Sequence, residues 1–93
     1  VLLLGCAHAG VVNTLDYVAA VTGTDRFHAV IGGMHLLRAS EERLNATAEA
    51  LDRYGVELIA PCHCTGASAS AHLWLHAPKR WNECAAGMVF EFG

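Results

Sequence analysis

The chain alternates short apolar runs with segments of helical periodicity, and this order constrains the fold more than any other feature. Apolar runs at residues 1–5, 27–31 and 56–60 each stop at glycine or proline, as buried strands do. Apolar residues at helical spacing follow each run. Strands that alternate with helices pair in parallel through right-handed crossovers. We therefore expect an α/β domain.

Residues that start or stop helices set the expected boundaries. A first helix is predicted over 10–21, a second over 40–55 with Ser40 as its N-cap, and a third over 65–76 with Thr65 as its N-cap. A last strand is predicted over 87–92, where apolar side chains alternate. The expected order is β-α-β-α-β-α-β within one domain that covers residues 1–93.

The composition is apolar for so short a chain. Hydrophobic residues make up 54% of the 93 residues and charged residues only 16%, whereas charged residues usually approach about 25%. Val1 opens directly into a buried-strand pattern. We expect the chain to be a piece of a longer protein, with one apolar face packed against a part that is absent.

Charge and hydropathy exclude several functions. A formal net charge of -3 with six scattered basic residues offers no footprint for nucleic acid. Apolar runs stay well short of the roughly 20 residues that span a membrane. The four cysteines do not resemble a disulfide framework, which predicts a reduced, cytoplasmic protein.

Histidine-containing loops follow all three predicted strands. The carboxyl ends of parallel strands lie at one edge of a sheet, about 5 Å apart, so the three imidazoles could reach one metal ion or one substrate. Unrelated loop histidines are an equally good interpretation of the spacing alone. The three residues concerned are His8, His35 and His63.

Other candidate ligands have plainer interpretations. Cys62 and Cys64 flank His63, and strand alternation would direct both to the opposite side, so we expect small packed side chains there. Cys84 is also expected to pack. His28 is expected to be an ordinary half-buried or surface residue. His72 and His76 lie one turn apart on the third predicted helix, a spacing that can bind metal, but without a nearby carboxylate they are expected to be solvated.

Two helix starts could hold an anion. Thr65 and Gly66 open one predicted helix and Gly10 opens another, and free N–H groups at a helix N-terminus attract phosphate or carboxylate. The same residues could simply cap their helices, and the sequence does not decide between the two.

Three motifs in order resemble one protein family. Gly5-Cys6-Ala7-His8-Ala9-Gly10, Ile31-Gly32-Gly33-Met34-His35 and Pro61-Cys62-His63-Cys64-Thr65-Gly66, with the closing segment 80–92, are similar to one branch of the metallo-β-lactamase superfamily. Members of that branch are labelled as similar to 7,8-dihydropterin-6-methyl-4-(β-D-ribofuranosyl)-aminobenzene-5′-phosphate synthase. The resemblance implies the C-terminal half of an αββα sandwich, without the histidine-rich metal motif of the N-terminal half.

The resemblance also implies roles for individual residues. His63 matches the family's last metal-binding histidine. Cys6 or His8 falls beside a second metal, with His8 favoured because a cysteine there would oxidise. His35 would be a further ligand or a catalytic group in contact with substrate. The implied cofactor is one or two divalent ions, with zinc favoured and iron or manganese as alternatives.

The implied activity is hydrolysis, in which metal-bound hydroxide attacks an ester, lactone or phosphoester of a small molecule that could carry a phosphate. The absent N-terminal half would be the second partner, and the chain alone is expected to be inactive. Two alternatives stay open: a non-enzymatic α/β module that binds an anion at Gly10, Thr65 and Gly66, and a truncated gene product without function.

Overall fold

The computed structural model describes residues 1–92 and contains a three-stranded parallel sheet with three helices. The sheet has the order β1-β2-β3, and the chain runs through β1 (Leu2–Leu4), β2 (Ala29–Gly33) and β3 (Leu58–Cys62). The helices are α1 (Val11–Thr22), α2 (Glu41–Arg53) and α3 (Ala67–His76), and a single 3-10 turn, η1 (His63–Thr65), precedes α3. The predicted α/β class is confirmed.

Two of the expected helix boundaries follow from local chemistry. Gly23 ends α1 in the left-handed conformation, with its N–H donating to Ala19 O, which is the geometry that glycine adopts at least cost. The Ser40 hydroxyl begins α2 by accepting a hydrogen bond from the Arg43 N–H at 3.2 Å. Among residues 1–92, none of the helices has the length and apolar character that a membrane span requires.

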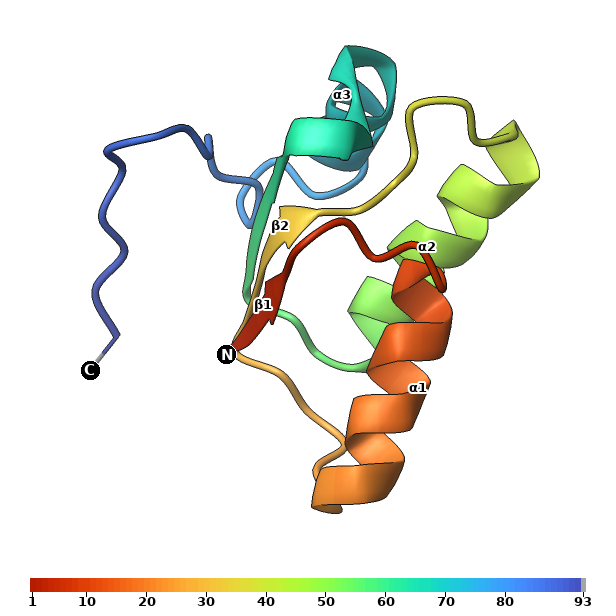
Figure 1. The fold of residues 1–93 in the computed structure, drawn as a ribbon, viewed down its shortest axis with the longest axis vertical. Coiled ribbons are helices and arrows are strands. Elements are labelled where there is room, and N and C mark those ends of the chain that lie inside the picture. The colour runs from red at the N-terminus through yellow and green to blue at the C-terminus, as the bar shows by residue number, and fades with distance from the viewer. Residues whose placement is uncertain (93) are drawn as a thin grey trace.

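All three helices contribute to a core on one face of the sheet. Figure 1 shows α1 and α2 on one side of the strands and the C-terminal segment on the other. One nearly inaccessible side chain comes from each of five elements: Leu15, Val30, Leu51, Ile59 and Leu73. Full burial of such a side chain stabilises the fold by roughly 1.5–3 kcal/mol.

The opposite face of the sheet is largely uncovered at β1. Leu2 and Leu4 pack against the core, and alternation along the strand places Leu3 on the other face, where it is 73% exposed. Leu3 is therefore an exposed apolar residue on the side of the sheet away from the helices.

The prediction of a last strand over residues 87–92 is wrong. These residues have no strand pairing, and Val89 is 80% exposed. The described chain instead adds a single bridge between Ile59 and Trp81 beside β3. The alternating pattern is present, but residues 87–92 pair with none of the three strands.

Candidate metal centre at the strand ends

Backbone and thiol hydrogen bonds tie the three strand-end loops together. The Gly33 N–H donates to Gly5 O at 3.2 Å and joins the loops after β1 and β2. The His35 N–H donates to Cys64 Sγ at 3.2 Å, and the Cys64 thiol donates to Cys6 O at 3.3 Å. Each loop is thereby held against the other two, and Cys64 contacts both neighbours.

Three residues in these loops adopt positive φ without being glycine. Ala7, His35 and His63 have φ values of 55°, 51° and 54°. Residues with a Cβ pay roughly 1–2 kcal/mol in this left-handed region, and such conformations concentrate at functional sites. One such residue follows each strand, so the chain turns sharply after all three strands, at the same edge of the sheet.

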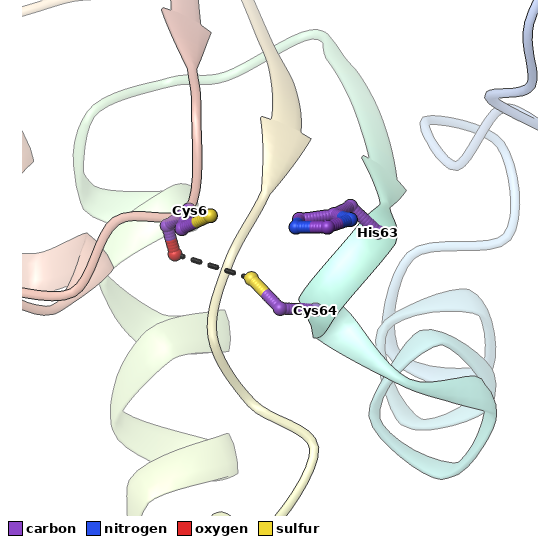
Figure 2. Close-up of side chains that lie close together, drawn as sticks. All are labelled: Cys6, His63 and Cys64. Atoms are coloured by element: carbon purple, nitrogen blue, oxygen red, sulfur yellow. Dashed lines mark hydrogen bonds between the residues drawn. The ribbon is translucent and has the colours of Figure 1, made fainter.

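Side chains from the first and third loops converge at this edge. One ligand atom from each of Cys6, His63 and Cys64 lies within 4.8 Å of the other two. Figure 2 shows the His63 ring and the two cysteine side chains turned toward a common space. His63 is exposed and both cysteines are half-buried, so the group is open to solvent on one side.

The convergence of Cys64 contradicts the expectation from strand alternation. β3 ends at Cys62, and His63 turns the chain into η1 instead of continuing the strand. Alternation therefore does not apply beyond Cys62, and Cys64 lies on the same side as His63. The sequence signal that could have placed Cys64 in this group is the Cys-His-Cys run at the end of a strand.

The two neighbouring thiols Cys6 and Cys64 disfavour each other's charged form. Partial burial and the adjacent Cys64 both raise the pKa of the Cys6 thiol, since a second sulfur nearby disfavours a second negative charge. A cation between the sulfurs would reverse this effect, because it stabilises thiolates.

The donor set fits a divalent metal such as zinc. Two thiols and an imidazole match its preferred ligands, and a fourth position open to solvent is typical of catalytic sites. Ligand atoms around a tetrahedral zinc ion lie roughly 3.5–3.8 Å apart, given bonds of about 2.0–2.3 Å. Since the ligand atoms lie within 4.8 Å of one another, the three side chains would need to close by no more than about 1.3 Å to reach these separations.

His8 and His35 lie together beside this group and are not part of it. Their ring centroids are 4.6 Å apart, with the planes at 52°. Both side chains are exposed. The structure thus places Cys6, rather than His8, next to His63, while His35 and His8 form a second imidazole pair at the same edge.

Two of the residues predicted to bind an anion, Thr65 and Gly10, already make hydrogen bonds within the chain. The Thr65 hydroxyl is buried, accepts from the Met34 N–H at 3.1 Å and donates to Cys62 O at 2.7 Å. It therefore holds the loops together and does not cap α3, whose N-cap is Gly66. The Gly10 N–H donates to Ala7 O, and Gly10 precedes α1 as its N-cap.

The remaining histidines and cysteines lie elsewhere. His28 pairs with Glu57 at 3.1 Å and His76 with Asp52 at 2.8 Å, both on the surface as expected. Burial, followed by the neighbouring Cys84 thiol, raises the pKa of Cys62. All four cysteines are free thiols.

A solved structure shares the fold of this chain. A crystal structure of Tm1679, described as a metal-dependent hydrolase of the β-lactamase superfamily, superposes with a TM-score of 0.88 and 34% identity over 97% of this chain. This chain covers 35% of that structure. It therefore has the fold of part of a metallo-β-lactamase-superfamily protein, and the resemblance expected from its sequence is confirmed. No protein-family model matches the chain.

The chain is also similar in sequence to a named enzyme. The chain is 33% identical over 92 residues to 7,8-dihydropterin-6-methyl-4-(β-D-ribofuranosyl)-aminobenzene-5′-phosphate synthase of Methanocaldococcus jannaschii. The match covers 99% of this chain and 31% of that protein, so the chain spans about a third of the relative's length. One relative is thus named a synthase and the other a hydrolase.

Proposed function

We propose that this chain supplies one part of the metal site of a metal-dependent hydrolase, with Cys6, His63 and Cys64 as ligands. The observation that carries the proposal is the convergence of these three side chains from two loops that are distant in sequence. Cys6 precedes His63 by 57 residues. Similarity to a β-lactamase-superfamily hydrolase over nearly the whole chain supports it.

A divalent ion held there would supply a water molecule of lowered pKa for attack on an ester, lactone or phosphoester. The residues of the chain would bind the ion and position the substrate. The His35 imidazole is exposed at the same edge and could hydrogen-bond the substrate or pass a proton to its leaving group. Zinc is the favoured ion because thiolate and imidazole ligands suit it.

We also propose that the remaining ligands and a covering layer for the exposed sheet face come from a longer parent protein. The support is the share of the relatives that the chain covers, about a third, and the 73% exposure of Leu3. Four free thiols suit a reducing compartment such as the cytoplasm, which stays part of the proposal.

Cobalt(II) titration of the chain tests the ligand assignment. Thiolate ligands give cobalt intense near-ultraviolet absorption, so binding and ligand type are read together. We expect His63→Ala to weaken binding by more than the roughly 10–100-fold that loss of an outer-shell partner costs. His28→Ala, an exposed histidine in the loop before β2, is the matched control.

Two outcomes would refute the assignment. If His63→Ala bound cobalt as tightly as the parent chain, His63 would not be a metal ligand. If cobalt bound without thiolate absorption, neither Cys6 nor Cys64 would be a ligand. A chain that binds phosphate but no metal would favour the non-enzymatic anion-binding module.

A further inference from the structure

A pocket of about 390 Å³ adjoins the cysteine-histidine group. Cys64 belongs to both, so a molecule in the pocket would lie directly beside the proposed metal ligands. The volume falls in the range of small-molecule sites, roughly 300–1,000 Å³. The pocket is formed by the loop after β2, the first turns of α2 and η1: His35, Leu37, Arg38, Ala39, Arg43 and Cys64.

The pocket carries two cationic side chains without acidic partners in its lining. Arg38 and Arg43 take part in none of the ion pairs found among residues 1–92. Glu41 and Glu42 are close in sequence, but they line a different hollow on α2. The positive charge of the two arginines is therefore available to a ligand.

Arg43 also lies over the start of α1. A Cβ added to Gly10, the N-cap of α1, would be 3.6 Å from Arg43 Nη2. The positive end of the helix dipole therefore adds to the charge of the guanidinium. The same arginine borders a second hollow formed by this helix start.

We propose that this pocket binds the phosphate of a phosphorylated organic substrate and presents that substrate to the metal group. The guanidinium group of arginine is positively charged and can donate two parallel hydrogen bonds to the oxygens of one phosphate. Leu37 and Ala39 offer apolar contact to the carbon skeleton, and His35 lies between the arginines' pocket and the His8 ring. This inference rests on the proposed function, because it names the substrate class of the same site.

The test is binding of phenyl phosphate and of inorganic phosphate to the chelator-treated chain, measured by calorimetry. Without metal, phosphate cannot bind through an ion. We expect phenyl phosphate to bind more tightly than inorganic phosphate. Arg38→Gln and Arg43→Gln should each weaken its binding roughly tenfold, as loss of one charge-assisted contact does. Arg26→Gln removes the same charge in the loop before β2 and should change binding less than twofold.

Unchanged phenyl phosphate binding in both pocket variants would overturn the inference, as would equal affinity for phenyl and inorganic phosphate. Cobalt titration of the same variants separates this failure from that of the proposed function. The arginine variants should bind cobalt like the parent chain, whereas His63→Ala should lose cobalt and retain phenyl phosphate.

Discussion

Gly33 lies at the point where the three strand-end loops meet, so adding a single methyl group there tests the arrangement of the metal group. A Cβ at this position would be 2.4 Å from Gly5 O, 3.0 Å from Cys64 Sγ and 3.2 Å from Cys6 Cα. The first distance is a clash with backbone, which has little freedom to move. Gly33→Ala should therefore push the β1 loop and Cys64 apart.

The expected cost has two parts. Overpacking of a tight contact costs roughly 1–3 kcal/mol, and loss of the hydrogen bond from the Gly33 N–H to Gly5 O adds about 0.5–1.5 kcal/mol. The sum, about 1.5–4.5 kcal/mol, is a large fraction of the roughly 5–14 kcal/mol expected for a domain of this size. Separation of Cys6 from Cys64 should also weaken cobalt binding.

Urea unfolding and cobalt titration measure the two effects. Gly5→Ala is the matched control, because a Cβ there meets nothing within 4 Å although the residue belongs to the same contact. Its free energy of unfolding should stay within about 0.5 kcal/mol of the parent chain. If Gly33→Ala were as stable as Gly5→Ala and bound cobalt as tightly, the close approach of the loops would not exist.

Two further substitutions test the supports of the site and of α3. Thr65→Val should lower the free energy of unfolding by about 1–3 kcal/mol in urea titrations, because it leaves the buried Met34 N–H without its acceptor. Desolvation raises the pKa of the Asp52 carboxyl, but hydrogen bonds from His76 and Arg80 outweigh it and hold the net pKa below its usual value. Since the unfolded pKa is about 3.9, this stabilisation exists above that pH and is lost as the pH falls through the lower folded pKa. Asp52→Asn should cost about 0.5–1 kcal/mol at pH 7, a value reduced for solvent screening, and the difference should vanish in melts well below pH 4.

The sequence predicted the order of the three strands and three helices, but it added a last strand over 87–92 and placed β2 and β3 two residues too early. β2 and β3 each extend two residues beyond the expected ends, through Gly32-Gly33 and through Pro61. Gly32 continues the ladder because the strand approaches β1 closely there: a Cβ would be 2.0 Å from Leu4 O. Pro61 is tolerated because β3 is an edge strand, where a missing N–H need not break the sheet.

The site was less predictable than the fold. Strand-end topology predicted that the loops carrying His8, His35 and His63 would share one edge, since each follows a parallel strand. Cys6 was a candidate only through the family resemblance, which favoured His8 in its place. Cys64 was missed because its position depends on the positive φ of His63, which no periodicity reveals. The arginine pocket was missed for a similar reason, because the loop that carries Arg38 folds against η1 only through long-range hydrogen bonds, from Leu36 and Leu37 to Cys64 O.

The uncovered side of the sheet leads to a last prediction about association. Leu3 is 73% exposed on this side, whereas Val21 is 66% exposed at the end of α1. The exposed Leu3 and the unpaired edge of β1 should make the isolated chain associate with itself. Leu3→Lys should reduce this association in sedimentation experiments over a range of concentrations, with a change of less than about 0.5 kcal/mol in monomer stability. Val21→Lys, an equally exposed residue on a helix, should leave association unchanged. A chain that stays monomeric at every concentration, or two lysine variants that behave alike, would mean that this face needs no covering layer.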